Sequence, residues 1–358
     1  MKICFLFNHF QHQDGIARAA IGIANILSES GNFDVTLLPI YRYKTKDRDL
    51  LYPNVRVKRF LGFYFKGLSS IVHKISPRLL YKLCVREEYD IEIAFMEGIA
   101  TMIVAHSIRP QKVRIAWIHN LEAAMKQREL YPFFAKVICV SKYNANKLKG
   151  EMPNLNVDFC YNPIDDKEVT RLGNEVADIT KNNCITFVSV GRISPEKGFE
   201  RLLDCVAILK GKGFRFELWL VGDGPQLNAL KTKACELGID DIVTFIGKKK
   251  NPHKYTSKAD VFICSSYTEG YSTACTEAVI LGVPVISTLV PGAEEIISAS
   301  GCGILAGKDD TSLQEAMEKV LCQPTIIDEW KKTLNITKKR FSMENRKMKL
   351  FVLLNNEL

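Results

Sequence analysis

Long apolar runs are absent from the 358-residue chain. A helix needs roughly 20 consecutive apolar residues to cross a bilayer, and no stretch approaches that length. The first seven residues are typical of a strand, because they lack the longer apolar core and the small-residue cleavage site of a secretion signal. We therefore expect a cytoplasmic protein.

Cysteine pairs at metal-binding or redox spacing are also missing. The eleven cysteines are scattered, form no C-x-x-C pair, and several lie in apolar stretches such as residues 137–140. An odd, scattered set favours buried free thiols in a reducing compartment over a disulfide framework or a zinc site. The neighbouring aspartates, such as Asp309 and Asp310, lack the Asp-x-Asp spacing after a strand, so no metal centre is indicated.

Common nucleotide and nucleophile motifs are missing too. The chain has neither the G-x-x-x-x-G-K-[ST] phosphate loop nor the G-x-S-x-G elbow. Gly222 and Gly224 follow an apolar stretch, but Leu227 occupies the third glycine position of G-x-G-x-x-G. A nicotinamide site is therefore not supported.

Acidic residues are scarce in the first part of the chain. Residues 1–150 contain 23 Lys and Arg against 12 Asp and Glu, whereas residues 151–358 contain 26 against 28, so the net charge of +9 comes from the first part. Residues 42–86 are the densest in cations and interleave them with apolar stretches such as residues 60–65. Such a surface suits an anionic membrane, suits nucleic acid, or is only a solvated face.

Short apolar stretches alternate with helix-length amphipathic ones, which predicts a parallel α/β architecture. Helices are expected near residues 16–30, after Glu97 and after Ser141, and again near residues 196–210, 225–237, 272–281 and 311–322. Strands are expected near residues 2–8, 34–38, 91–95, 113–118 and 136–140, and near residues 184–190, 215–221, 242–246, 260–264 and 283–287. Two serial sets of this kind predict two Rossmann-like, doubly wound domains facing a central cleft.

Composition also suggests where the domains end. Residues 166–182 are polar and charged without sustained periodicity, as expected of a linker. We predict an N-terminal domain over residues 1–165, a C-terminal domain over residues 183–340, and a terminal packing helix over residues 341–358.

The most informative segment covers residues 261–284, which predict a buried strand, a loop and a helix. Glu277 is the only charged residue between Gly270 and Ala293, and a carboxylate on so apolar a helix is costly unless something bonds to it. Glu269 lies in the loop before the helix, where free backbone N–H groups favour an anion. The segment offers amides for a phosphate and two carboxylates for hydroxyl groups. Alternatively, Glu269 caps the helix and Glu277 pairs with a Lys or Arg.

A second segment, residues 191–198, follows another predicted strand. Ser194 suits a helix N-cap and the following Pro195 suits the first helical position. Arg192 and Lys197 would then flank a helix N-terminus, an arrangement that suits a diphosphate better than a neutral ligand. The alternative is a surface ion pair between Arg192 and Glu196.

Two further residues come from the first part of the chain. Gly15, in the loop after the first strand, would let a ligand approach the backbone closely. His119 ends the predicted strand over residues 113–118, where a side chain could face the cleft, although a single histidine is more often structural.

Together these segments resemble the retaining glycosyltransferases of family 4, also called group 1, which have the two-domain GT-B fold. Glu269 and Glu277 stand as in the family's E-x7-E signature, and residues 191–198 are similar to its G-R-hydrophobic-x-x-E-K-G motif. Residues 14–18 are similar to its N-terminal G-G-x-x-R loop, with Asp14 in place of the first glycine. The resemblance is strongest over residues 184–310.

The resemblance implies a role for each matching residue. Arg192 and Lys197 would neutralise the donor diphosphate, Glu277 would bind the ribose hydroxyls, and Glu269 would bind the transferred sugar. The other donor contacts would come from the backbone at Gly15 and Gly191, from the amides of Gly270, Tyr271 and Ser272, and from His119 at the donor sugar.

It also implies an activity, namely transfer of a sugar from a nucleotide-sugar donor to a glycan acceptor, expected to be lipid-linked, in cell-surface polysaccharide biosynthesis. No cofactor and no divalent metal is expected, because cations and helix amides can stabilise the leaving diphosphate. The basic N-terminal domain would bring the enzyme to the inner face of the cytoplasmic membrane, and the terminal helix would cross back onto that domain. An epimerase or a soluble disaccharide synthase of the same fold is the alternative. A nucleic-acid-binding protein would leave Glu269 and Glu277 without a role, so no nucleic-acid partner is expected.

Overall fold

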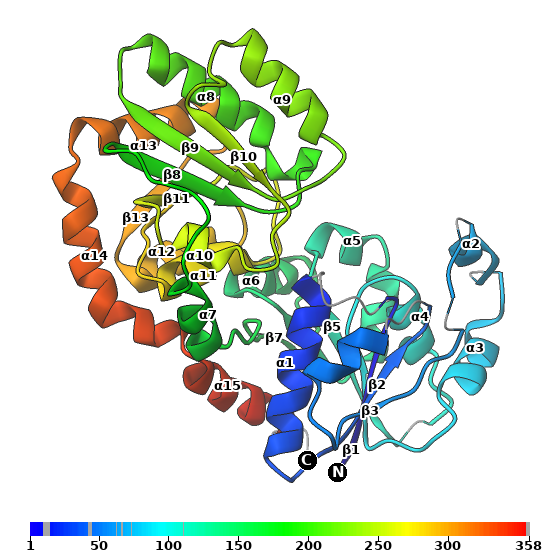
Figure 1. Ribbon diagram of the computed structural model, residues 1–358. Coiled ribbons are helices and arrows are strands. Elements are labelled where there is room, and N and C mark those ends of the chain that lie inside the picture. Colours follow the sequence, from blue (N-terminus) through cyan, green and yellow to red (C-terminus); the bar gives the residue numbers. More distant parts are fainter. Residues whose placement is uncertain are drawn as a thin grey trace. The chain divides into compact units, whose positions relative to one another are not determined.

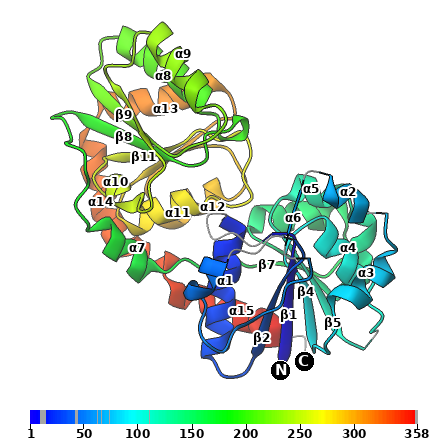
Figure 2. The same ribbon diagram turned by 45° about the vertical axis from the view of Figure 1, so that its right-hand side comes forward.

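The computed structural model describes residues 1–9, 15–41, 45–61, 63–65, 67–72, 74–109 and 111–355. The chain forms two compact units, which Figures 1 and 2 show from two sides. Unit 1 comprises Met1–Pro163 together with Arg346–Leu358, and unit 2 comprises Ile164–Asn345.

Unit 1 is built on a parallel sheet with, among the described residues, seven strands in the order β3-β2-β1-β4-β5-β6-β7. The strands are β1 (Lys2–Phe7), β2 (Asp34–Pro39), β3 (Arg56–Val57), β4 (Ile91–Ala94), β5 (Val113–Ile118), β6 (Lys136–Cys139) and β7 (Val157–Phe159). Most of their side chains are buried, as expected of a parallel sheet covered on both faces. The strand order reverses between β1 and β4, and such a switch point is where open α/β sheets bind ligands.

The helices of unit 1 connect these strands. In α1, Ala20, Ile23, Ala24 and Leu27 recur at helical spacing and are buried, so this apolar face holds the helix to the unit. The elements are α1 (Gly15–Glu29), η1 (Thr45–Leu50), α2 (Leu68–Val72), α3 (Pro77–Cys84), α4 (Ile99–Ala105), α5 (Leu121–Met125), η2 (Arg128–Phe133) and α6 (Lys142–Glu151).

Unit 2 repeats the plan with six parallel strands among its described residues, in the order β10-β9-β8-β11-β12-β13. The strands are β8 (Ile185–Val190), β9 (Phe216–Val221), β10 (Val243–Gly247), β11 (Val261–Cys264), β12 (Val285–Thr288) and β13 (Gly303–Ala306). The order reverses between β8 and β11, which are hydrogen-bonded neighbours. The other elements are α7 (Asp166–Gly173), η3 (Pro195–Lys197), α8 (Phe199–Gly211), α9 (Leu227–Glu236), α10 (His253–Thr256), α11 (Thr273–Ile280), α12 (Ala293–Ser300), α13 (Asp310–Cys322), α14 (Thr325–Thr337) and η4 (Lys338–Phe341).

The two sheets confirm the predicted class of two doubly wound α/β domains. Each of the ten predicted strands coincides with a strand of the structure, while β3, β7 and β13 were not predicted. The strands β3 and β7 have only two and three residues, and β13 begins at Gly303, a residue type that is rare in strands.

The expected linker differs from the structure. Residues 166–182 begin with α7, whose N-cap Asp165 accepts a hydrogen bond from the Glu168 amide at 2.9 Å. Gly173 packs so closely within unit 2 that an added Cβ would lie 2.3 Å from the Leu281 side chain. The polar composition concealed this helix because only Val169 and Gly173 of α7 are buried.

The helix α15 (Met343–Asn355) begins in unit 2, and from Arg346 onward it belongs to unit 1. Leu350, Leu353 and Leu354 are buried there, and Lys349 pairs with Asp158 of β7 at 2.9 Å. Ten residues of this helix, far from residues 1–163 in sequence, are therefore part of the unit-1 structure.

All eleven cysteines are free thiols, and most are buried, although Cys235 and Cys322 are exposed. Among the helices of the described residues, none combines the length and the apolar character that crossing a membrane requires.

Candidate active site

Two loops of unit 2 meet at the switch point between β8 and β11. The Ser265 hydroxyl donates to the Lys197 carbonyl at 3.0 Å, and the Tyr267 amide donates to the Glu196 carbonyl at 2.9 Å. These bonds join the loop after β11 to the loop after β8. Residues predicted separately from the two segments are thus held in one place by backbone contacts.

Lys197 and Glu269 form an ion pair within this junction, with 2.6 Å between Nζ and Oε1. The Ser266 hydroxyl donates to the same carboxylate oxygen at 2.7 Å. Burial of the ammonium group lowers its pKa, but the Glu269 carboxylate more than offsets this, and the pKa of Lys197 is raised above its ordinary value. Both side chains remain partly open to solvent, at 28% and 13% exposure, so a ligand can reach a lysine that stays protonated.

The loop after β8 departs from the predicted helix near residues 196–210. Ser194 is the N-cap and Pro195 the first residue of the short turn η3, and α8 begins only at Phe199. Gly198 separates the two because it adopts φ +62°, which favours glycine. A Cβ on Gly198 would also lie 2.2 Å from the Ser265 carbonyl oxygen, so the close contact between the two loops requires a glycine here.

Arg192 and Gly191 lie at the start of the same loop. Arg192 is exposed, while Glu196 accepts a hydrogen bond from the Ser194 hydroxyl at 2.5 Å. Gly191 is approached by the backbone of Gly222, where a Cβ would lie 1.8 Å from the Gly191 carbonyl oxygen. The incomplete dinucleotide motif therefore has a packing role, since it brings the loop after β9 against the loop after β8.

The residues directly before α11 form its N-terminal cap. Ser272 is the N-cap, and its hydroxyl accepts a hydrogen bond from the Cys275 amide at 3.3 Å. Tyr271 is buried against Gly292, where a Cβ would lie 2.6 Å from the tyrosine ring. Gly270 precedes them at the N-terminal end of the helix, which carries the positive end of its dipole.

Glu277 lies in the second turn of α11, close to a buried histidine. Its carboxylate is 3.9 Å from Nδ1 of the buried His253 at the start of α10. The carboxylate is still 12% exposed, so it remains accessible on an otherwise apolar helix. His253 is a residue of this region that sequence reasoning missed.

Arg201 is a second missed residue, on α8, and it is only 2% exposed. Its guanidinium donates to the carbonyls of Ser265 and Ser266, each at 2.7 Å, and lies 4.0 Å from the centre of the Tyr267 ring. It therefore fixes the backbone of the loop that leads to Glu269. A charged residue on an amphipathic helix is usually exposed, so no local pattern indicated this role for Arg201.

In unit 1, His119 follows β5 and is buried, with its ring 4.8 Å from that of Phe95. Its Nε2 is buried without a hydrogen-bond partner. Burial lowers the pKa of His119 to about 3, so the imidazole is neutral at physiological pH. The buried Glu97, after β4, accepts hydrogen bonds from the amides of His119 and Asn120 at 2.5 and 2.7 Å, and burial raises its pKa.

Gly15 begins α1, and a Cβ at this position would meet nothing within 4 Å. This open position leaves room for another group to approach the backbone. Asp14 of the proposed N-terminal motif lies outside the described residues, as does the rest of the loop over residues 10–14.

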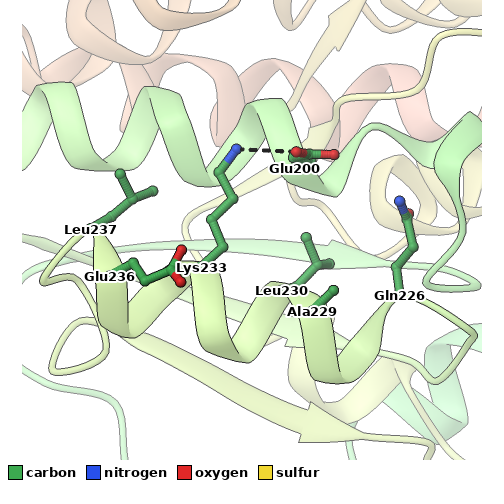
Figure 3. Close-up of a pocket in the computed structure, with 7 residues that line it drawn as sticks. All are labelled: Glu200, Gln226, Ala229, Leu230, Lys233, Glu236 and Leu237. Carbon is green, nitrogen blue, oxygen red and sulfur yellow. Dashed lines mark hydrogen bonds and ion pairs between the residues drawn. The ribbon is translucent and has the colours of Figure 1, made fainter.

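A separate depression of about 390 Å³ lies between α8 and α9 (Figure 3). Lys233 and Glu200 form a 3.5 Å ion pair across it. The residues lining it are Glu200, Gln226, Ala229, Leu230, Lys233, Glu236 and Leu237, which include none of the predicted site residues. The candidate site is thus distinct from this depression.

Comparison with known proteins agrees with this geometry. Residues 176–340 match the family model described as glycosyl transferases group 1. A Haemophilus influenzae protein named as an uncharacterized glycosyltransferase is 23% identical over 86% of this chain and 87% of its own length. The Rhizobium meliloti lipopolysaccharide core biosynthesis glycosyltransferase LpsD is 28% identical, but the match spans only 41% of this chain and 42% of the relative.

Solved structures share the fold over the whole chain. Sucrose-phosphate synthase from Thermosynechococcus elongatus has a TM-score of 0.80 at 17% identity, covering 99% of this chain and 98% of that one. The Anabaena protein HepE in complex with UDP has a TM-score of 0.74 at 18% identity, covering 99% and 100%. The two units therefore have the two-domain GT-B fold. The match to the glycosyl transferases group 1 lies within unit 2.

Proposed function

We propose that this chain is a retaining glycosyltransferase that moves a sugar from a nucleotide-sugar donor to a glycan acceptor. The Lys197–Glu269 pair at the unit-2 switch point is the observation that carries the proposal. It puts a protonated amine and a carboxylate in the loops that lead into α8 and α11. A diphosphate binds to cations and helix amides, and sugar hydroxyls bind to carboxylates. A fold of this kind holds UDP in the Anabaena protein.

The chemistry follows from the charges of these residues. As the bond between the sugar and the diphosphate breaks, negative charge develops on the diphosphate and positive charge on the sugar. Lys197, Arg192 and the N-terminal end of α11 would stabilise the negative charge, and removing one such donor typically raises the barrier by about 2.7–4 kcal/mol. Because protein cations serve here, we propose a reaction that needs no divalent metal. Glu269 would bind the transferred sugar and Glu277 the ribose.

We propose two further contacts with the donor, made by His119 and Gly15 of unit 1. The neutral His119 has an unpartnered Nε2, and it can bind a sugar hydroxyl in a way that a charged imidazolium could not, by accepting its hydrogen. The open backbone at Gly15 would take a phosphate from the unit-1 side. Retention of the anomeric configuration would follow from attack on the face that the diphosphate leaves, and nuclear magnetic resonance of the product tests it.

The names of the relatives support a role in polysaccharide assembly. The lipopolysaccharide core enzyme from Rhizobium meliloti and an amylovoran biosynthesis glycosyltransferase from Erwinia amylovora, 29% identical over 43% of this chain, both build cell-surface glycans by their names. We propose a lipid-linked glycan acceptor at the inner face of the cytoplasmic membrane. The basic N-terminal part of the chain would face that membrane.

A soluble small-molecule acceptor is the second candidate, favoured by the similarity to sucrose-phosphate synthase over the whole chain. A disaccharide synthase or an epimerase of this fold would turn over its nucleotide sugar without a lipid. Incubation with nucleotide sugars and soluble sugar phosphates, with and without lipid-linked glycans, separates the two candidates.

The donor site is tested by thermal stabilisation with UDP, GDP, ADP and their common sugars. We expect one base to raise the melting temperature by several degrees, and we expect Lys197→Ala and Glu277→Ala to reduce that rise. Lys210→Ala is the matched control, because Lys210 forms a comparable ion pair with Asp241, at 2.5 Å, elsewhere in unit 2. The control should keep the full rise.

No rise with any donor in the folded wild-type protein would overturn the proposal. Tight binding of DNA or RNA with steep salt dependence, and without nucleotide-sugar binding, would instead support a nucleic-acid-binding protein.

A further inference from the structure

One segment of unit 1 is rich in cations and contains no acidic residue. Between Arg59 and Arg86 the sequence holds six Lys and Arg and not a single Asp or Glu. Five of these cations are exposed in the structure, namely Arg59, Lys74, Arg78, Lys82 and Arg86. A positive charge this concentrated attracts an extended anionic partner.

The helix α3 presents apolar side chains next to these cations. Its inner face buries Leu80, Tyr81 and Cys84. Its outer face carries Leu79, which is 49% exposed, and Leu83 one turn later, which is 39% exposed. Arg78 and Lys82 are also one turn apart, each directly before one of these leucines. The outer face therefore has two leucines and two cations side by side.

Residues 63–65 form a second segment, in which one aromatic side chain packs against unit 1 and two are exposed. The Tyr64 ring lies 4.7 Å from that of His9 and 5.4 Å from that of Tyr41, which follow β1 and β2. Its neighbours Phe63 and Phe65 are 54% and 51% exposed, and their rings are parallel with centroids 6.4 Å apart. The tyrosine anchors the segment while two phenyl rings face outward.

We infer that an anionic phospholipid bilayer binds unit 1 through Phe63, Phe65, Arg78, Leu79, Lys82 and Leu83. Both elements lie over one core, in which Leu80 and Tyr81 are buried and against which Phe60 and Leu61 pack. Figures 1 and 2 both show α3 at the periphery of unit 1. The apolar side chains of both elements would enter the acyl boundary, and the cations would contact the lipid phosphates.

The pairing of charges with apolar side chains selects this partner over nucleic acid. A nucleic-acid backbone would neutralise Arg78 and Lys82 but leave Leu79 and Leu83 in water. A bilayer accommodates both, because its phosphates and its hydrocarbon lie at neighbouring depths. If only charge attracted the partner, a high salt concentration would abolish the binding. Because these residues include exposed apolar side chains, part of the binding should persist at high salt.

The purpose of this membrane contact rests on the proposed function, because the bilayer would carry the lipid-linked acceptor of the transferase. Tyr64 contacts rings at the carboxyl ends of β1 and β2, the edge of a sheet at which α/β domains bind ligands. A bilayer against Phe63 and Phe65 would thus bring a lipid-linked acceptor to that edge. The binding itself does not require the acceptor.

The experiment is sedimentation of the full chain with phosphatidylcholine vesicles, with and without phosphatidylglycerol, at about 0.15 M and about 1 M salt. Wild type should bind the anionic vesicles at least about tenfold more tightly than the neutral ones. Phe63→Ser/Phe65→Ser should weaken that binding about tenfold and remove what persists at high salt. Arg78→Glu/Lys82→Glu should weaken it about tenfold at low salt.

Two control variants make the same kinds of substitution, a charge reversal and the loss of an exposed apolar side chain, outside the proposed membrane-binding residues. Lys147→Glu/Lys149→Glu reverses two exposed charges on α6 of unit 1, and Ile336→Ser removes an exposed apolar side chain from α14. Both should bind as wild type does. The single variants Leu79→Ser and Arg78→Glu repeat the test if a double variant fails to fold.

Equal vesicle binding by wild type and by all the surface variants would overturn the inference. So would retention of RNA in place of anionic vesicles, or a dimer in solution that Phe63→Ser/Phe65→Ser dissociates, because a second copy would then cover the surface. Donor-nucleotide stabilisation is measured in every variant. Its persistence while vesicle binding is lost separates this inference from the proposed function, which fails only when the nucleotide effect is absent.

Discussion

At the scale of single residues, the unusual feature is how many polar groups are buried near the carboxyl ends of the strands. In unit 1, His119 and Glu97 are both buried, and burial shifts the two pKa values in opposite directions. In unit 2, Arg201 is buried and bonds to the backbone of the loop before Glu269. A buried polar group is costly without partners, and we propose that this concentration of buried polar groups belongs to the binding site.

The pKa of His119 predicts a dependence of stability on pH. Its value in the folded protein is about 3, below the value of about 6.5 for an exposed histidine. The unfolded chain therefore takes up a proton first as the pH falls. The contribution of the neutral His119 to the free energy of unfolding is fully present above pH 6.5 and is lost as the pH falls toward 3. At pH 5 the loss amounts to about 2 kcal/mol.

The measurement is urea unfolding of wild type and of His119→Gln at pH 7.5 and pH 5. The decrease in the free energy of unfolding from pH 7.5 to pH 5 should be about 2 kcal/mol smaller in the variant than in wild type, because glutamine does not titrate. Titration of Glu97 is common to both proteins and cancels in the comparison. An equal loss in both would show that His119 does not hold a depressed pKa.

At the scale of elements, the junction of two loops at Gly198 determines the geometry of unit 2's candidate site. The residue combines φ +62° with a backbone contact that leaves no room for a Cβ. The chain offers a matched comparison in Gly238, which has φ +63° but open space around the Cβ position. The two glycines therefore separate the cost of the dihedral angle from the cost of the contact.

We predict that Gly238→Ala lowers the free energy of unfolding by about 1–2 kcal/mol, the cost of the left-handed conformation. Gly198→Ala should cost clearly more and should also abolish donor-nucleotide stabilisation, because the Ser265 carbonyl must move and Glu269 moves with its loop. Urea unfolding and thermal shift with the preferred nucleotide measure both effects. A Gly198→Ala protein that binds the nucleotide as Gly238→Ala does would refute the role of this contact.

Elements were predictable from the sequence where a run of apolar residues was long. The ten predicted strands are such runs, whereas β3 has two residues and β13 begins with a glycine. The helix α7 was missed because it buries little apolar surface.

For the candidate site, the sequence motifs indicated which residues to consider but not their partners. Lys197 and Glu269 are 72 positions apart, and only the parallel pairing of β8 with β11 brings them together. His253 as the partner of Glu277, and Arg201 beneath the loop, depend on tertiary contacts that no local pattern encodes.

At the scale of the whole molecule, unit 1 is made of two separate pieces of the chain. Arg346 bonds to the Asn162 carbonyl, Lys347 pairs with Glu29 at 2.8 Å, and the Phe351 ring stacks on that of Phe33 with 6.5 Å between centroids. The helix α15 is thus part of the stability of unit 1, although in sequence it directly follows unit 2.

A chain ending at Asn345 should therefore lose stability in unit 1 and not in unit 2. Amide hydrogen exchange should become faster in α1 and β7, which pack against α15, while α8 and β9 keep their protection. Nucleotide stabilisation should persist if unit 2 holds the donor. Uniform protection in the shortened chain, or loss confined to unit 2, would contradict this expectation.

The same division sets an order of events during synthesis. When the ribosome has completed Asn345, every residue of unit 2 has been made, whereas unit 1 still waits for residues 346–355. In the sequence, unit 2 separates the two pieces of unit 1. Unit 1 is therefore begun first during synthesis and completed last. The nascent N-terminal part of unit 1 consequently lacks the buried side chains of Leu350, Leu353 and Leu354 throughout the translation of more than 180 residues, and its apolar surface stays incomplete for that time.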